Sequence, residues 1–241
     1  MHVTITYLDN SGFTVEWGNR CLIFDYYNLT PREGTLSDGV VRPEDIKKKH
    51  TTVFVSHSHY DHYHPGIFDL EKEIPDIGYV LSDDIHKQPS GNRLLVAPGQ
   101  DYQWRGMTIH TLRSTDLGVA FLVKVDGMTI YHAGDLNWWH WIGEPDEDNR
   151  RMGENFLHEI GSLPQKEIDL AFIPTDPRQE QNYLLGLQAF MKRVSARYIV
   201  PMHFGPRTEV FQWLRQDPRT KEYRARIIEL SKRGQCVQLS L

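Results

Sequence analysis

Short β-prone runs separated by turn sequences fill the first part of the chain. Residues 3–8, 13–17 and 21–25 are such runs, and Asp9-Asn10-Ser11-Gly12 and Gly18-Asn19-Arg20 separate them. Because residues of this kind favour tight turns, the pattern predicts a β-meander. The pair Asp126-Gly127 predicts a hairpin, since it tolerates the backbone angles of a two-residue turn. Later apolar runs predict further strands at residues 78–81, 94–97, 107–112, 119–125, 128–132, 168–174, 198–203 and 236–241.

Helical signals are fewer and lie mainly in the second half of the chain. Residues 180–194 carry apolar side chains at helical spacing, which predicts one helix over this range. Pro43 followed by two acids predicts a helix start. Other helices are predicted at residues 65–73 and 149–160 and near residues 210–214. No repeat or linker divides the sequence, so the pattern predicts one α/β domain over residues 1–241.

Composition and charge narrow the class of partner. The chain has 241 residues, of which 39% are hydrophobic and 11% aromatic, as in an ordinary globular core. Its formal net charge is −5, with both signs interspersed along the sequence. This balance opposes binding to nucleic acid or to an anionic membrane, and it favours a small-molecule substrate as the partner.

The cysteines and the N-terminus bear on the cellular compartment. Cys21 and Cys236 are the two cysteines; a disulfide between them is one interpretation, and two buried thiols in a reducing cytoplasm is the simpler one. The sequence opens on a strand-like run, without the basic and apolar regions of a signal peptide. No apolar run is long enough to span a bilayer. These features predict a soluble, cytoplasmic protein.

A histidine-rich segment carries the clearest chemical signal. Ser56-His57-Ser58-His59-Tyr60-Asp61-His62 follows directly after the apolar run at residues 52–55. Three imidazoles and a carboxylate within six residues suit metal binding better than packing, since both groups are usual ligands of zinc and related ions. A tight loop here could serve two metal positions, with Asp61 and His62 turned towards the second.

Three other polar residues follow predicted strands. Asp135 comes after the run at residues 128–132 and after Gly134, which would let the backbone approach a site closely. A carboxylate at Asp135 could bridge two cations. His203 ends the run at residues 198–203, just before Phe204-Gly205. Asp25 ends an early run, where it could hydrogen-bond a ligating histidine and fix its tautomer.

Taken together, these pieces resemble the metallo-β-lactamase superfamily. The segment from His57 to His62 matches its HxHxDH signature, and the other acids and His203 follow in the expected order. The segments at residues 10–13 and 131–135 look most like the branch of ascorbate-phosphate lactonases and N-acyl-phosphatidylethanolamine phospholipase D. The resemblance covers nearly the whole chain and implies a four-layer αββα sandwich, with a metal site in a cleft at one edge.

The resemblance also implies a ligand set, with Zn²⁺ as the expected cofactor in one or two copies. His57 and His59 would hold the first metal, and Asp135 would bridge both. Asp61, His62 and His203 would hold the second metal, and Asp61 would also orient the water or accept a proton. A bound divalent ion lowers the pKa of water towards neutrality. The expected reaction is therefore hydrolysis of an ester, lactone, amide or phosphodiester bond.

One position departs from the superfamily pattern. A third histidine for the first metal usually precedes the bridging acid by some twenty residues, and the matching segment at residues 112–118 contains none. The missing ligand falls near Ser114. The first site is then weak or empty, or Asp116 substitutes and shifts preference towards Mn²⁺ or Fe²⁺, or His132 or His140 supplies the ligand.

The segment Asn137-Trp138-Trp139-His140-Trp141 follows the bridging acid directly. Trp138 and His140 are candidates for one wall of a substrate pocket, and core packing of the indoles is the competing interpretation. Arg178 could bind a substrate anion, with a surface salt bridge as its alternative role.

Other functions on the same fold fit less well. A flavodiiron oxidoreductase has an acid where His59 stands, and it needs a flavin module. A nuclease of the superfamily needs extra domains and a basic groove. The remaining alternative to a hydrolase is a non-catalytic or weakly active metal-binding member of the fold.

Overall fold

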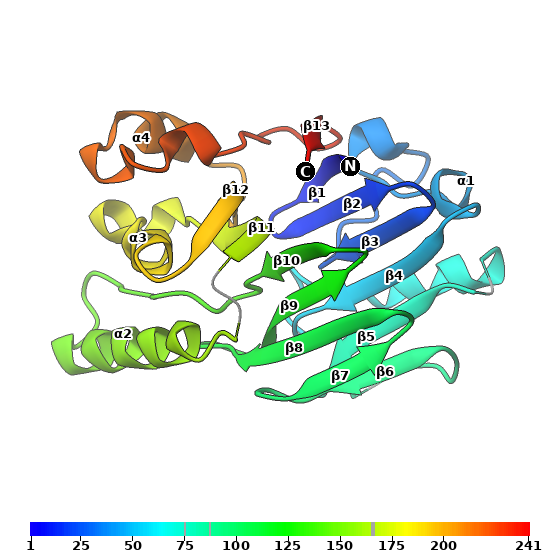
Figure 1. The fold of residues 1–241 in the computed structure, drawn as a ribbon, viewed down its shortest axis with the longest axis horizontal. Coiled ribbons are helices and arrows are strands. Elements are labelled where there is room, and N and C mark those ends of the chain that lie inside the picture. Colours follow the sequence, from blue (N-terminus) through cyan, green and yellow to red (C-terminus); the bar gives the residue numbers. More distant parts are fainter. Residues whose placement is uncertain (75, 87, 165–166) are drawn as a thin grey trace. The chain divides into compact units, whose positions relative to one another are not determined.

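The computed structural model describes residues 1–74, 76–86, 88–164 and 167–241. The chain divides into two compact units (Figure 1). The first comprises Met1–Ala97 with Leu230–Leu241, and the second comprises Pro98–Glu229. The expectation of a single domain over residues 1–241 stays a prediction.

A seven-stranded sheet forms the centre of the first unit, in the order β13-β1-β2-β3-β4-β5-β6. The predicted meander is confirmed, because β1, β2 and β3 pair antiparallel in sequence order. Strands β3 to β6 are parallel to one another, so their carboxyl ends lie at one edge of the sheet. The strands are β1 (His2–Asp9), β2 (Gly12–Trp17), β3 (Arg20–Phe24), β4 (His50–Val55), β5 (Gly78–Ser82), β6 (Arg93–Val96) and β13 (Cys236–Ser240).

One face of this sheet is covered by short helical segments. Alternate residues of β3, Cys21 and Ile23, share a buried apolar cluster with Val53 and Val55 of β4. The covering segments are α1 (Pro43–Ile46) and the 3₁₀ helices Leu36–Asp38 and Pro65–Lys72. The helices predicted to start at Pro43 and to span residues 65–73 are therefore present, but the first is short and the second is of the tighter 3₁₀ type. The 3₁₀ turn at Leu36–Asp38 was not predicted.

A six-stranded sheet forms the centre of the second unit, in the order β12-β11-β10-β9-β8-β7. Strands β10, β11 and β12 are parallel, and two antiparallel pairings through β9 give β8 the same direction. The strands are β7 (Asp101–Trp104), β8 (Met107–Arg113), β9 (Val119–Val125), β10 (Met128–His132), β11 (Glu167–Pro174) and β12 (Ser195–Met202). The helices are α2 (Asp146–Gly161), α3 (Leu185–Met191) and α4 (Val210–Gln216), with 3₁₀ helices Pro177–Asn182, Pro218–Thr220 and Arg224–Arg226.

The predicted hairpin between β9 and β10 is confirmed. Asp126 has φ 51° and Gly127 has φ 80°. Both central residues of a type I′ turn need positive φ, and the Asp-Gly pair tolerates it at low cost.

The prediction of one helix over residues 180–194 is wrong. The structure has a 3₁₀ helix at Pro177–Asn182 and a separate α3, and Glu180 has the non-helical angles φ 51° and ψ −123°. The apolar spacing is real, but it does not report the backbone break at Glu180. Strand β7 also went unpredicted, because its four residues alternate without a strong apolar run.

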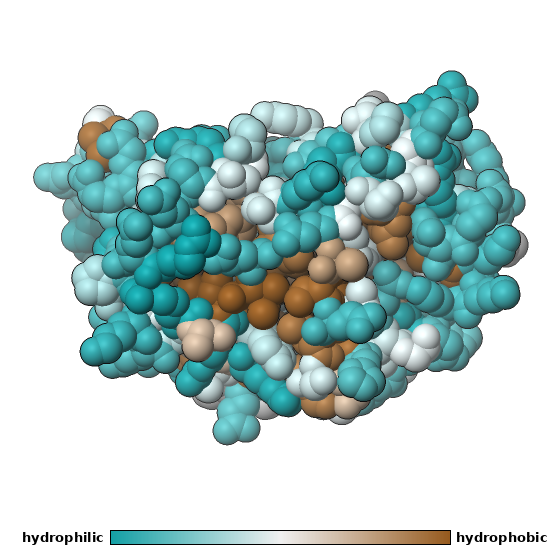
Figure 2. All heavy atoms as spheres, turned by 90° about the horizontal axis from the view of Figure 1, so that it is seen from above, coloured by the Kyte–Doolittle hydropathy of each residue, from teal (hydrophilic) through white to brown (hydrophobic). Residues whose placement is uncertain are grey.

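Hydrophilic side chains predominate on the face drawn in Figure 2, with apolar side chains showing between them. Cys21 is buried and Cys236 is exposed, and neither forms a disulfide. The expectation of two buried thiols is therefore wrong for Cys236, which lies on the edge strand β13. Among the described residues, no helix is long and apolar enough to cross a membrane.

Candidate metal centre

The histidine-rich loop of the first unit begins where β4 ends. Because β3 and β4 are parallel, Asp25 and Ser56 follow adjacent strand ends. Strand β1 runs in the same direction as β3, so the turn containing Asn10 lies at this edge as well. The topology thus gathers the polar residues that sequence analysis singled out in this half of the chain.

His57 and His59 converge through their ring nitrogens. Nε2 of His57 lies 3.1 Å from Nδ1 of His59. Two nitrogen ligands of one tetrahedral ion, each bound at about 2.0–2.1 Å, lie about 3.3 Å apart. The spacing of the two histidines therefore fits two ligands of a single metal ion.

A buried carboxylate fixes the protonation of this loop. Asp25, with no exposed surface, accepts the Ser56 backbone N–H (2.8 Å) and the Ser56 hydroxyl (2.7 Å). Since the hydroxyl proton goes to Asp25, the hydroxyl oxygen accepts Nδ1–H of His57, 2.9 Å away. Asp25 also accepts Nδ1–H of His62 at 2.8 Å. His57 and His62 each present an unprotonated Nε2, the form that binds a metal.

Asp61 stands beside His62 and is held from the β1–β2 turn. Its Oδ2 accepts the side-chain amide of Asn10 at 3.1 Å and lies 3.9 Å from Nε2 of His62. Asp84, after β5, accepts the backbone N–H of Ser58 at 2.8 Å and so anchors the loop from another strand end.

A matching set of polar residues lies at one edge of the second sheet. Asp135, Asp176 and His203 follow the carboxyl ends of the parallel strands β10, β11 and β12. Nε2 of His203 lies 3.4 Å from Oδ1 of Asp135, and both residues are buried. This separation fits two ligands of one ion, as with His57 and His59.

His203 is held in an uncommon backbone conformation by buried contacts. Its φ is 62°, a left-handed value that strains a residue with a side chain. Nδ1 of His203 donates to Asp176 at 3.0 Å, and the Trp139 ring packs edge-on at 5.3 Å. With Nδ1 occupied by this bond, Nε2 is left to face Asp135.

Asp176 is an ionised carboxylate in a buried setting. Burial by itself raises its pKa, but hydrogen bonds from His203 and Arg178 outweigh that effect, so the pKa lies below its usual value. Arg178 does form a salt bridge, but with a partner that is 1% exposed and not with a surface acid.

The loop that lacks the expected histidine brings a carboxylate instead. Asp116 and Asp135 each offer an oxygen, and these atoms lie within 4.8 Å of one another. Thr115 holds the Asp116 loop beside the segment that follows Asp135. Its hydroxyl donates to the Asn137 carbonyl (2.6 Å) and accepts the Asn137 N–H (3.0 Å). Ser114 accepts the backbone N–H of Asp116 at 3.1 Å, so it shapes the loop.

The two candidate histidines of this region lie differently. His132 is fully buried, its Nδ1 accepts the Gly134 N–H at 3.2 Å, and its ring lies 5.7 Å from that of Phe172. His140 is half-buried. Across the part of the chain that the structure describes, neither belongs to a group of ligand atoms close enough to share an ion.

The tryptophans after Asp135 have distinct environments. Trp139 is buried, and its indole N–H donates to the Asp135 carbonyl at 3.0 Å. Trp141 is half-exposed and stacks on Trp139 with ring centres 5.7 Å apart. Asn149 fixes the Trp141 backbone through two hydrogen bonds of 2.9 Å. Trp141 therefore lies on the solvent side of the buried Trp139.

Trp138 packs against α2, and a substitution on that helix tests this contact. A Cβ added at Gly153 would overlap the Trp138 indole. Alanine gains up to about 1 kcal/mol of helix propensity, whereas overpacking costs about 1–3 kcal/mol, so we expect Gly153→Ala to lower the free energy of unfolding by about 1 kcal/mol. Gly161→Ala, where a Cβ meets nothing within 4 Å on the same helix, is the control, and urea unfolding measures both. Equal stability of the two variants would show that the Trp138 indole does not pack closely against Gly153.

Comparison with known proteins assigns the family. A family model described as the beta-lactamase superfamily domain matches residues 4–140, more than half of the chain. The chain belongs to the β-lactamase superfamily. The predicted fold class, mixed α/β with two sheets of the metallo-β-lactamase type, is confirmed. The branch suggested by residues 10–13 and 131–135 stays a prediction.

Relatives within the β-lactamase superfamily match most of the chain. A UPF0173 metal-dependent hydrolase of Bacillus licheniformis is 23% identical over 89% of both chains. YtkL of Bacillus subtilis, also named a metal-dependent hydrolase, is 25% identical over the same shares. Igni18, a metallo hydrolase of Ignicoccus hospitalis, covers both chains fully with a TM-score of 0.68 and 18% identity.

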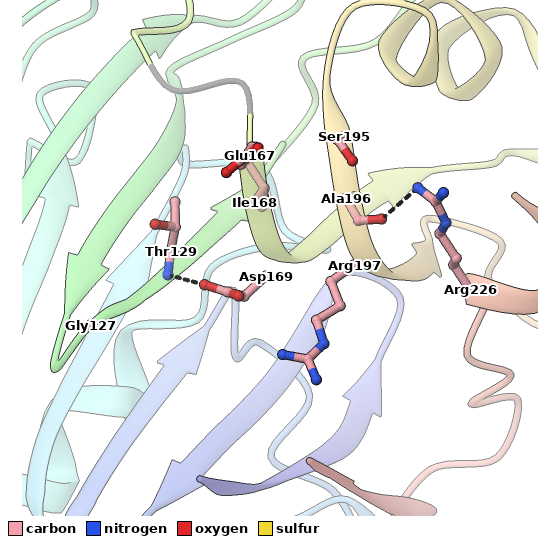
Figure 3. Close-up of a pocket in the computed structure, with 9 residues that line it drawn as sticks. All are labelled: Gly127, Thr129, Glu167, Ile168, Asp169, Ser195, Ala196, Arg197 and Arg226. Atoms are coloured by element: carbon pink, nitrogen blue, oxygen red, sulfur yellow. Dashed lines mark hydrogen bonds between the residues drawn. The ribbon is translucent and has the colours of Figure 1, made fainter. Parts of the chain in front are cut away.

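A cavity lies at the other end of the strands that Asp176 and His203 follow. It has a volume of about 520 Å³ and is lined by the first residues of β11 and β12, the β9–β10 turn and Arg226 (Figure 3). Asp169 accepts the Thr129 N–H there, at 2.8 Å. Because Asp176 and His203 follow the opposite ends of these eight-residue strands, the cavity is roughly 20 Å from them.

Sequence analysis missed several residues that orient the predicted ligands. Ser56, Asn10 and Asp84 support the histidine-rich loop, and Asp176 supports His203. The sequence held a signal for Ser56 and Asp176, namely their position after a predicted strand. Ser56 directly follows β4, and Asp176 comes two residues after β11. For Asn10 the turn was identified, but its contact with Asp61 depends on sheet order.

Proposed function

We propose that the protein is a metal-dependent hydrolase that cleaves an ester, lactone, amide or phosphodiester bond of a small molecule. The observation that carries the proposal is the spacing of His57 and His59, whose ring nitrogens are 3.1 Å apart with the tautomer of His57 fixed by Ser56. Such a pair needs a proton or a cation between its two nitrogens. The metal-dependent names of the relatives favour the cation.

The donor sets of the two units fit divalent ions. His57 and His59 would hold a first ion, Asp61, His62 and His203 a second, and Asp135 both. The resemblance to the metallo-β-lactamase superfamily implies this assignment. Zn²⁺ is the cofactor that imidazole-rich ligands favour, in one or two copies. Asp116 would serve the first ion in place of the missing histidine, and its oxygen admits Mn²⁺ or Fe²⁺.

The chain's own groups prepare the site for hydrolysis. A bound divalent ion would supply hydroxide near neutral pH by lowering the pKa of water. Asp61, held by Asn10, is placed to orient that water or to accept its proton. Asp25 and Asp176 keep Nε2 of His62 and His203 unprotonated for the ions.

Substrate binding would use the half-exposed residues after Asp135. Trp141 is half-exposed and lies one indole away from His203, so its ring offers apolar surface beside the Arg178 guanidinium. His140, also half-buried, stays a candidate contact, whereas Trp138 is engaged with α2. A planar or apolar group of a small molecule, such as a sugar face, would fit this wall.

The free thiols of Cys21 and Cys236 favour a cytoplasmic location, and we expect neither nucleic acid nor membrane as partner.

Metal content per chain, measured by elemental analysis on protein purified without a chelating tag, tests the proposal. Two equivalents would support a dinuclear hydrolase with Asp116 as the replacement ligand. One equivalent would support a mononuclear enzyme at the second position. No metal after addition of Zn²⁺ or Mn²⁺ would overturn the proposal.

Activity on a panel of esters, lactones, amides and phosphodiesters separates an enzyme from the alternative. A non-catalytic metal-binding member would hold metal and cleave none of them. His57→Ala should lower both metal content and turnover, and His158→Ala, on the surface helix α2, is its matched control.

A further inference from the structure

The sequence Asp-Pro-Arg occurs twice in the second unit, with the same local structure. It spans residues 176–178 and 217–219. In both places the aspartate caps a 3₁₀ helix that starts at the proline. The aspartate Oδ1 accepts the arginine backbone N–H, at 2.8 Å in the first copy and 2.9 Å in the second. Proline fixes the backbone at the first helical position and aspartate is a favoured cap, so both residues favour the same turn in each copy.

The arginine side chain completes the same clamp in both copies. Nε of Arg178 donates to both carboxylate oxygens of Asp176, at 3.0 and 2.8 Å, and Nη2 bonds Oδ2. Arg219 repeats these bonds to Asp217, with both Nε distances 3.0 Å. Each guanidinium also lies over an aromatic ring, Trp141 for Arg178 and Tyr183 for Arg219. A forked guanidinium of this kind fixes the plane of the carboxylate as well as its position.

The two clamps differ in what the carboxylate holds. Asp217 accepts the Tyr183 hydroxyl at 3.1 Å. Asp176 instead accepts Nδ1–H of His203, whose Nε2 faces Asp135 at 3.4 Å. The direction of the His203 ring therefore depends on the plane of the Asp176 carboxylate, and Arg178 fixes that plane.

We propose that Arg178 is a positioning residue for the metal ligand His203, acting through Asp176. The inference rests on the proposed function, because it assigns Arg178 to the metal site described there. Although 60% of the Arg178 side chain is exposed, its charge is already balanced by Asp176, so it attracts a substrate anion weakly. This role replaces the substrate contact expected for Arg178 from the sequence.

The experiment compares Arg178→Gln with Arg219→Gln in the full chain. Both changes break the same bonds, but only the first touches a carboxylate that supports His203. We measure the dissociation constants for Zn²⁺ and Co²⁺ by competition with a chelator, the visible spectrum of the Co²⁺ form, and urea unfolding of the metal-free protein. We expect Arg178→Gln to weaken metal binding roughly tenfold to a hundredfold and to alter the Co²⁺ spectrum, as loss of outer support to a histidine ligand does. Arg219→Gln should bind metal as the wild type does.

The outcomes separate the inference from the proposed function. Wild-type metal binding in Arg178→Gln, or equal weakening in both variants, would overturn the inference while leaving the metal site in place. Absence of metal binding in the wild type would overturn the proposed function itself. Arg178→Lys keeps the charge but loses the fork, so a loss of affinity in this variant too supports positioning even if the glutamine variant folds poorly.

Discussion

Asp135→Asn should remove most of the bound metal and lower hydrolytic turnover about a hundredfold or more, while the fold stays intact. The amide has the shape of the carboxylate, but it lacks the charge and one acceptor oxygen that two cations would share. The backbone carbonyl of Asp135 keeps its bond from Trp139 in the variant, because that bond does not involve the side chain. Elemental analysis and turnover on the most reactive substrate of the panel measure the effect.

Asp169→Asn is the matched control for this change. Asp169 also lies in the second unit and accepts one backbone N–H, from Thr129, but it lies at the opposite end of β11. Metal content and turnover should match the wild type in the control. Full metal content in Asp135→Asn would remove Asp135 from the ligand set.

Asp25→Ala should lower the free energy of unfolding by about 4 kcal/mol. The substitution removes the acceptor of three hydrogen bonds in a site with no exposed surface. Their donors are the N–H and hydroxyl of Ser56 and Nδ1–H of His62. Loss of one member of a buried charged network costs about 3–5 kcal/mol. Asp25 also has φ 43°, and alanine tolerates such an angle less well than aspartate, which adds about 1 kcal/mol. Asp25→Asn keeps the backbone preference and one acceptor, so it should lose about half as much.

Asp126→Ala compares this cost with that of a positive φ at an exposed position. Asp126 has φ 51° but lies exposed in the β9–β10 turn, so its substitution should cost about 1 kcal/mol. Urea unfolding of the metal-free forms gives all three values. If Asp25→Ala lost no more than Asp126→Ala, the hydrogen bonds of Asp25 would contribute nothing measurable to stability.

Features governed by near neighbours in sequence were predictable. The β9–β10 hairpin depends on Asp126 and Gly127 alone, and the first meander depends on short turns. The histidine-rich loop was identified because its three histidines and its carboxylate lie within six residues. In each case the feature depends on a few consecutive residues, so it can be predicted from the sequence alone.

Features that depend on contacts between distant strands were not predictable. The support of Asp61 by Asn10 spans 51 positions, and that of His203 by Asp176 spans 27. Both require knowledge of which strand ends share a sheet edge. The break at Glu180 was missed for another reason, since apolar periodicity reports which face is buried and not whether the helix is continuous.

Cys21 is buried and Cys236 is exposed, so a thiol reagent should react selectively with Cys236. Burial raises the pKa of the Cys21 thiol and shields it from reagents, while Cys236 is open to solvent. Strand β13 is joined to β1 through its backbone, so a group attached to Cys236 leaves the hydrogen-bond ladder unbroken. The chain can therefore be captured on a disulfide-exchange resin and released with a mild reductant, which allows metal content to be measured without a polyhistidine sequence that competes for the metal.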